Sequence, residues 1–168
     1  MSNNWNLDLA ELANGCRGNL CSDRLGSSRC ESPTGLCLAL PYSISEVSMG
    51  CHIGKLLVLK NRSSPTIALE LFRHAILVDG QFAIWLTDNL LIVRQYDYNP
   101  KLNQQTDTSL LLLRVNSADY AIIPNSSSIE STAHLDESGM SLELSPSTKH
   151  GSTRVALEVL DWQEISEA

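Results

Sequence analysis

The sequence predicts a mainly β fold, and three observations lead to that prediction. Short apolar runs bounded by turn residues recur along the chain from residue 36 onward. An Asp-Gly pair, Asp79-Gly80, separates two of these runs, which is typical of a tight hairpin. The second half of the chain also weakly echoes the first. Nine apolar runs predict a barrel or a sandwich, with strands at residues 36–40, 55–60, 75–78, 81–86, 90–95, 110–115, 120–123, 140–144 and 154–160.

The first 35 residues predict a short helix followed by a long loop. Trp5, Leu9 and Leu12 have helical spacing after an asparagine pair that suits a polar cap, and the helix should end by Asn14-Gly15. Residues 15–35 are rich in Gly, Ser, Arg and Cys and show no apolar periodicity. We therefore treat residues 1–35 as an N-terminal helix with a cysteine-rich loop, and residues 36–168 as the β domain.

Three further segments have local signals. Residues 116–119 predict a looser hairpin, and residues 65–75 fit either a helical turn or a strand. At the C-terminal end, Asp161 could cap a last helical turn through Trp162 and Ile165, with Glu164 as its capping-box partner. Trp85, between two apolar neighbours, is predicted to lie in the core.

The echo between the two halves involves two short matches. Residues 38–41, Leu-Ala-Leu-Pro, correspond to residues 121–124, Ala-Ile-Ile-Pro, and each segment is followed by an isoleucine and a glutamate. Gly80, the apolar run 82–86 and Asp88 correspond to Gly151, the run 155–160 and Asp161. The offsets are similar but unequal. A true duplication would make the fold two related β lobes.

Composition excludes several functional classes. Twelve basic and nineteen acidic side chains give a formal charge of −7, which opposes binding to nucleic acid. The apolar runs are far shorter than the roughly 20 residues needed to cross a bilayer. The N-terminus lacks the pattern of a secretory signal. We therefore expect a cytoplasmic protein that neither inserts into membranes nor binds nucleic acid.

The five cysteines, all within residues 16–51, are expected to be reduced thiols in a loop or in the core. No close cysteine pair typical of structural zinc is present, although Cys16, Cys21 and the pair Cys51-His52 leave a zinc site open as an alternative. A cysteine enzyme with His74, His134 or His150 as base is the other chemical alternative. No cofactor and no metal are predicted.

No established catalytic motif occurs in the chain. The GxSxG, phosphate-loop, GxGxxG and HExxH patterns are all missing. His134 with Asp136 and Glu137 is the one compact group of a histidine and carboxylates, and its polar surroundings favour a solvated surface turn. Arg17, Arg24 and Arg29 form the main basic concentration and are also expected to be solvated. We expect the protein not to be an enzyme.

Taken in order, the β segments resemble the CheW-like coupling proteins of bacterial chemotaxis over roughly residues 34–165. TGLCLALPYSISEV (34–47) is similar to the first-lobe segment of that family, and AILVDGQFAIWLTDNLL (75–91) to its stretch around Asn-Leu-Arg-Gly. LLLLRVNSADYAII (110–123) resembles the second-lobe strand pair, and TRVALEVLDWQEI (153–165) the closing strand and helix. Of Asn-Leu-Arg-Gly only Gly80 is present, and the arginine position is Asp79, so no role of that arginine carries over.

The resemblance implies two small SH3-like β-barrel lobes with short N- and C-terminal helices. It implies an adaptor that joins the regulatory domain of a histidine kinase to receptor tips, in chemotaxis or pilus-type motility. Val78, Asp79 and Gly80 would lie near the kinase contact, and Trp162 is expected to be a partly exposed anchor for a protein partner. The alternative is a β-rich, self-associating structural or accessory protein, for instance of a virus.

Overall fold

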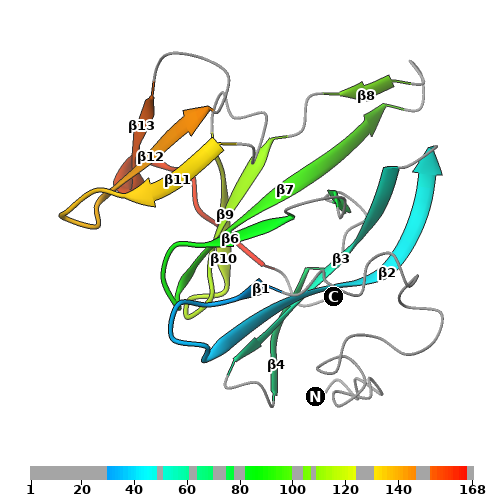
Figure 1. Ribbon diagram of the computed structural model, residues 1–168, viewed down its shortest axis with the longest axis horizontal. Coiled ribbons are helices and arrows are strands. Elements are labelled where there is room, and N and C mark those ends of the chain that lie inside the picture. Colours follow the sequence, from blue (N-terminus) through cyan, green and yellow to red (C-terminus); the bar gives the residue numbers. More distant parts are fainter. Residues whose placement is uncertain are drawn as a thin grey trace.

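The computed structural model is built almost entirely of antiparallel β-strands (Figure 1). It describes residues 30–48, 51–60, 64–69, 75–77, 82–99, 104–106, 109–123, 131–146 and 152–165. In the first third of this set the strands are β1 (Cys30–Glu31), β2 (Cys37–Ser48), β3 (Cys51–Lys60), β4 (Ser64–Leu69) and β5 (Ala75–Leu77).

Nine strands and one short 3-10 helix follow in the remainder of the described chain. They are β6 (Ala83–Trp85), β7 (Leu90–Asn99), β8 (Gln104–Thr106), β9 (Leu110–Arg114), β10 (Asp119–Ile123), β11 (Ser131–Leu135), β12 (Ser141–Pro146), β13 (Thr153–Ala156), η1 (Leu157–Val159) and β14 (Gln163–Glu164). The helical residues within these ranges form no segment long and apolar enough to span a membrane.

The strands form two sheets. The larger sheet runs in the order β1-β2-β3-β5-β7-β9-β10-β14, with β4 added to β3, and β6 and β8 added to β7. The smaller sheet has the order β11-β12-β13. Short strands follow one another along the edges of long ones: β4 and β5 share one edge of β3, and β5 and β6 share one edge of β7. The long strands β3 and β7 therefore organise the larger sheet.

This topology corrects the predicted hairpin at Asp79-Gly80. The strands on either side of the pair, β5 and β6, do not pair with each other. Instead both pair with β7: β5 at Gln95 and Tyr96, and β6 at Leu91 to Val93. The turn residues 78–81 themselves lie outside the described residues. The local Asp-Gly signal predicts a reversal of the chain but cannot exclude a better partner elsewhere, and β7 offers a longer apolar strand to both runs.

The hairpin predicted at residues 116–119 is confirmed. Strands β9 and β10 pair along their full length, from Arg114 opposite Asp119 to Leu110 opposite Ile123. Ala118 in the turn has a φ of 54°, a left-handed conformation that is uncommon for a residue with a side chain. The tight connection places Arg114, at the end of β9, directly opposite Asp119, at the start of β10.

The larger sheet curls so that its first strand meets β6. The indole Nε1 of Trp85 donates a hydrogen bond to the Cys30 carbonyl at 2.8 Å, and the Cys30 thiol lies 3.5 Å from the Ala83 carbonyl. Next to this contact, the Thr34 hydroxyl donates to Asp88 Oδ2 at 2.6 Å. These side-chain contacts hold β1 against β6. Trp85 is buried in the core, as predicted.

Buried side chains form two cores on opposite faces of β7, β9 and β10. The first core lies within the curled sheet, and the second lies beneath the small sheet. Alternate residues of β7 and β9 point to opposite faces, so both strands are apolar at consecutive positions. Leu91, Val93, Leu111 and Leu113 join the first core, whereas Leu90, Ile92, Leu110 and Leu112 join the second.

The small sheet buries one face and exposes the other. Leu142, Leu144 and Val155 pack into the second core, together with Leu160 just after η1. Opposite them, His134, Glu143 and Arg154 stand in one cross-strand row on the outer face, at paired positions of the three strands. This alternation is typical of an antiparallel sheet with one solvated side.

The nine predicted strands all overlap observed ones. The segment 65–75, which fits both patterns, begins as strand β4. The predicted N-terminal helix lies outside the described residues, whereas residues 30 and 31 of the predicted loop form β1. The predicted C-terminal helical turn is wrong for residues 161–165, since Gln163 and Glu164 form β14 against Tyr120 and Asp119. A paired strand satisfies backbone groups that an isolated turn leaves to solvent.

The weak internal echo does not extend to the strand pairing. Strand β2, in the first copy, lies between β1 and the strand that follows it, β3. The corresponding strand β10 lies between β9 and β14, while the next described strand, β11, belongs to the other sheet. The two halves of the described chain thus differ in connectivity.

Strand β5 joins the two parts of the larger sheet, and Ile76 is its central residue. Ile76 lies opposite Gly54 on β3 and Gln95 on β7, and its side chain is fully buried in the first core. We predict that Ile76→Ala lowers the free energy of unfolding by about 3 kcal/mol, because it leaves a cavity at this junction. Ile122→Ala, at a side chain that is 44% exposed, is the control. Urea unfolding followed by tryptophan fluorescence measures both, and equal effects would contradict the central position of Ile76.

Candidate protein-binding surface

The predicted binding residues fall in two places. Val78, Asp79 and Gly80 lie outside the described residues, between β5 and β6. Their proximity to a partner stays a prediction. Trp162 is described and lies in the segment between η1 and β14. The structure gives Trp162 definite neighbours, which decide how freely it can serve as an anchor.

Trp162 is half-buried against the second core. Its Nε1 donates a hydrogen bond to the Leu157 carbonyl at 3.0 Å. The guanidinium carbon of Arg114 lies over the ring, 3.8 Å from the ring centroid. A guanidinium at this distance makes a favourable cation–π contact. One face of the indole is therefore covered by Arg114, and the role of Trp162 as an anchor for a protein partner stays a prediction.

Arg114 is itself fixed by Asp119 across the β9–β10 hairpin. Its Nε donates to Asp119 Oδ1 at 2.7 Å, its terminal nitrogen pairs with Oδ2, and the Ser117 hydroxyl donates to Oδ1 at 2.9 Å. Partial burial raises the pKa of Asp119, but the hydrogen bonds from Arg114 and Ser117 outweigh it and lower that pKa below its usual value. The fork geometry orients the guanidinium plane over Trp162.

Two more contacts fasten the C-terminal segment to the same hairpin. The Ile165 amide donates to the Ala118 carbonyl at 2.9 Å, and the Tyr120 hydroxyl donates to Gln163 Oε1, also at 2.9 Å. Trp162 stands between these contacts and Leu157. Sequence reasoning could not find the contact between Arg114 and Trp162, because the two residues are far apart in the chain and neither belongs to a motif.

The turn between β11 and β12 is ordered by Asp136. One carboxylate oxygen, Oδ1, accepts hydrogen bonds from the Ser138 hydroxyl at 2.9 Å and from the amides of Met140 and Ser141 at 3.0 and 3.1 Å. The other, Oδ2, pairs with Arg154 at 2.6 Å. Gly139 supplies the positive φ of 70° that the turn requires. The turn is thus held from several directions by one side chain.

These bonds change the ionisation of Asp136. Desolvation raises its pKa, but the hydrogen bonds from Ser138, Ser141, Met140 and Arg154 outweigh that effect and lower the pKa to about 2. The carboxylate is therefore charged at any neutral pH. The predicted solvated turn is confirmed for Glu137, whereas His134, which is also exposed, lies on β11. His134 Nε2 lies 3.1 Å from Glu143 Oε2, on the outer face of the small sheet.

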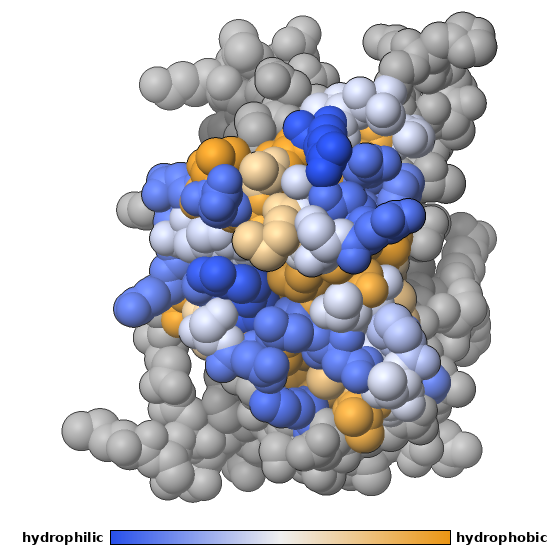
Figure 2. Space-filling view, turned by 90° about the vertical axis from the view of Figure 1, so that its left-hand side faces the viewer, coloured by the Kyte–Doolittle hydropathy of each residue, from blue (hydrophilic) through white to orange (hydrophobic). Residues whose placement is uncertain are grey.

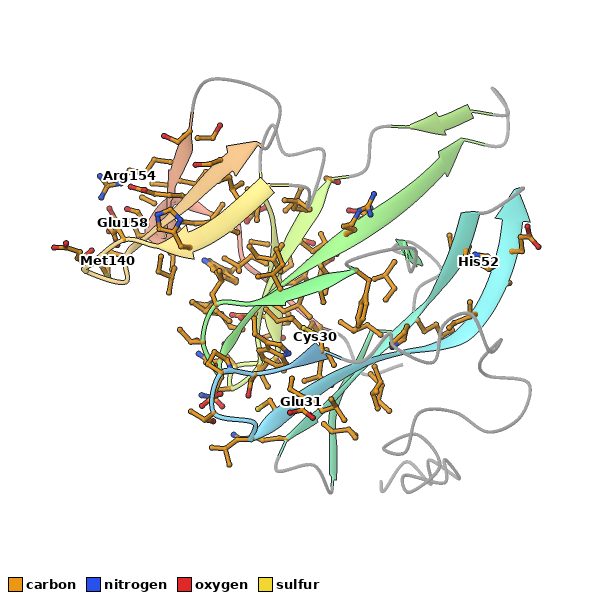
Figure 3. All side chains as sticks on the ribbon, in the orientation of Figure 1. Cys30, Glu31, His52, Met140, Arg154 and Glu158 are labelled. Carbon is orange, nitrogen blue, oxygen red and sulfur yellow. The ribbon has the colours of Figure 1, made fainter. Side chains whose placement is uncertain are left out.

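The two cysteines whose side chains are described lie in or against the first core. Cys37 is buried, with its sulfur 3.5 Å from the Asp88 carbonyl. Burial raises the pKa of Cys30, which disfavours the reactive thiolate. Figure 3 shows Cys30 well apart from His52. Among the described residues no group of three or more potential ligands could hold a metal ion. Cys16 and Cys21 and the Cys51 side chain lie outside this description.

Large apolar side chains are exposed at four described positions, of which two lie on segments joined by a hydrogen bond. Met140 is 56% exposed at the β11–β12 turn and Val159 is 72% exposed at the end of η1. The Leu157 amide donates to the Met140 carbonyl at 2.9 Å and joins the two segments. We call Met140, Val159 and the exposed acids Glu137 and Glu158 beside them the hairpin-tip patch.

The hairpin-tip patch lies at one end of the small sheet. Figure 3 places Met140, Glu158 and Arg154 together at this end. Figure 2, which looks onto this side of the molecule, shows apolar side chains reaching the surface between polar ones. No motif in the sequence marks the patch. Leu36 and Ile122, the other two exposed apolar residues, lie in the turn after β1 and on β10.

Comparison of the chain with protein-family models, with curated proteins and with solved structures gives no significant match.

The contacts of Trp162 yield a prediction about stability. Trp162→Ala should lower the free energy of unfolding by about 2 kcal/mol, since it removes a half-buried ring and the stack with Arg114. Trp162→Phe keeps a ring beneath the guanidinium and loses the hydrogen bond to Leu157, which should cost about 1 kcal/mol. Chemical denaturation measures both variants. An alanine variant as stable as the parent would indicate that Trp162 is a free surface anchor.

The lowered pKa of Asp136 yields a prediction about pH. The charged carboxylate contributes stability that is complete above its ordinary pKa of 3.8 and is lost as the pH falls through about 2. Asp136→Asn should therefore be less stable than the parent at neutral pH, and the difference should shrink between about pH 4 and pH 2. Urea unfolding across this range measures it, with Glu137→Gln as the control. A difference that is independent of pH would contradict the assignment.

Proposed function

We propose that this chain is a non-catalytic cytoplasmic adaptor that couples receptors to a histidine kinase in chemotaxis or pilus-type motility signalling. The observation that carries the proposal is the division of the buried residues into two cores on opposite faces of β7, β9 and β10. In this proposal the two cores belong to two small lobes that share β7, β9 and β10, in place of the two separate barrels that the resemblance implies. Binding through such lobes needs no cofactor.

The order of the strands supports the resemblance to the coupling proteins. The segment 34–47 contains most of β2, and 75–91 runs from β5 through β6 to the start of β7. Residues 110–123 form the β9–β10 hairpin, and 153–165 include β13 and β14. Each resembling segment therefore coincides with strands that build or border the two cores, in the order that the family has.

The surface chemistry fits binding to other proteins. Exposed apolar side chains surrounded by polar ones, such as those of the hairpin-tip patch, are common at protein interfaces. The formal charge of −7 disfavours nucleic acid and anionic lipid as partners. In this proposal Val78, Asp79 and Gly80 lie near the kinase contact, and Trp162 is a partly exposed anchor for a protein partner.

A second candidate function is self-association as a structural or accessory protein, such as a viral one. The observation that favours it concerns the small sheet: within the described residues, β11 and β13 each form a ladder with β12 alone. Strand edges of this kind can pair with another copy. Light scattering distinguishes this candidate, because a large symmetric assembly in place of an 18.4 kDa monomer would favour it.

Binding to a kinase regulatory domain and to receptor tips tests the adaptor proposal. Full-length protein, shown to be folded by circular dichroism, should be retained by both partners immobilised on beads. Asp79→Arg should weaken kinase binding by about tenfold or more, since it reverses a charge at the expected contact. Glu164→Arg, the same reversal at an exposed position of β14, should leave binding unchanged. Folded protein that binds neither partner would overturn the proposal.

A further inference from the structure

We propose that the hairpin-tip patch binds an extended segment of a partner protein in which one or two apolar side chains are flanked by lysine or arginine. This inference rests on the proposed function, because it assumes that the chain works by binding proteins. It adds a specific surface and the chemistry of its partner. The patch shares no residue with Val78–Gly80, where the kinase contact is expected.

The apolar part of the patch is unusually exposed. Met140 and Val159 are the two most exposed large apolar side chains among the described residues, at 56% and 72%. Single exposed apolar residues are ordinary on a protein surface. Here two of them lie on segments that the hydrogen bond from the Leu157 amide to the Met140 carbonyl joins, and half-buried Leu157 packs against the second core. Together they offer a small apolar platform.

The platform is held rigidly before any partner arrives. Asp136 binds the Met140 and Ser141 amides and Arg154, and the Leu157 amide is bonded to the Met140 carbonyl. Behind η1, Trp162 donates to the Leu157 carbonyl. A surface fixed in this way loses little conformational entropy when a ligand binds, so more of the contact energy appears as affinity.

The charges around the platform are acidic. Glu137 lies in the same turn as Met140, Glu158 precedes Val159, and Asp161 follows two residues later, all of them exposed. The nearby cation, Arg154, is already paired with Asp136. Lysine and arginine beside an apolar side chain would complement this rim, and the charge of the whole chain would speed their approach.

The same charges argue against a second copy as the occupant. In a symmetric dimer built on this patch, each acidic residue of one rim would face the acidic rim of the other copy. Like charges placed opposite one another in an interface are unfavourable. Both copies would also carry the formal charge of −7. A basic segment of a different protein meets neither obstacle.

The test uses the full chain and two fluorescein-labelled peptides of twelve residues. In the first, two adjacent leucines are flanked by lysines on both sides; in the second, serines replace the leucines. Fluorescence anisotropy at low and physiological salt should show binding of the leucine peptide, weaker at higher salt, and at least about tenfold weaker binding of the serine peptide.

Variants locate the binding on the patch. Each of the variants Val159→Asp, Met140→Asp and Glu158→Lys should lower the affinity for the leucine peptide by about tenfold, as expected for residues at the centre of a small interface. Leu36→Asp, at an apolar side chain that is 53% exposed elsewhere, and Glu164→Lys should bind like the parent. Circular dichroism checks that every variant is folded.

Three results would overturn the inference: no binding of the leucine peptide, equal binding of the serine peptide, or full binding by folded Val159→Asp. Self-association of the parent that is lost in Val159→Asp would also overturn it, since a second copy would then occupy the patch. Retention by the kinase domain and receptor tips tests the adaptor proposal separately. If the chain is retained by the kinase domain and receptor tips but does not bind the leucine peptide, this inference is contradicted and the adaptor proposal is not.

Discussion

The burial of β7 and β9 on both faces is the constraint on which the rest of the structure depends. Leucines at four consecutive positions of β9 alternate between two cores, so neither face of the strand can be given to solvent. The curled part of the larger sheet must cover one face and the small sheet the other. The position of every other described strand follows from this requirement, since each either lines one of the two cores or pairs with a strand that does.

This constraint also explains how far the fold could be predicted from the sequence. Apolar runs bounded by turn residues located nine strands, because burial on a pleated surface leaves a local signature, although the last run, 154–160, leaves β13 at Ala156 and continues as η1. The same runs do not say which strands pair. Asp79-Gly80 therefore predicted a hairpin between two segments that both pair with β7 instead. The C-terminal turn was mistaken for a helix because Gln163 and Glu164 gain their backbone partners from β10, far away in the sequence.

The candidate surface was harder to predict than the fold. Trp162 was singled out for its residue type, but its contact with Arg114 depends on a hairpin formed elsewhere in the chain. Met140 and Val159 carried no signal at all, since an exposed apolar residue looks like a core residue in a sequence. The pairing of β12 with β13 and the hydrogen bond from Leu157 to Met140 bring the two segments that carry them together. A surface patch of this kind is formed by tertiary contacts between separate segments, so it cannot be recognised from the sequence of either segment.

Because two cores share β7 and β9, the part of the chain that the structure describes has no internal point at which it could be divided into independent halves. A fragment ending at Ile123 would retain the first core but would leave the side of Leu90, Ile92, Leu110 and Leu112 uncovered. A sheet face of that composition would drive the fragment to aggregate or to seek another cover. Evolutionary exchange of one half by recombination would meet the same obstacle, so inserted segments are best tolerated at connections that touch neither core.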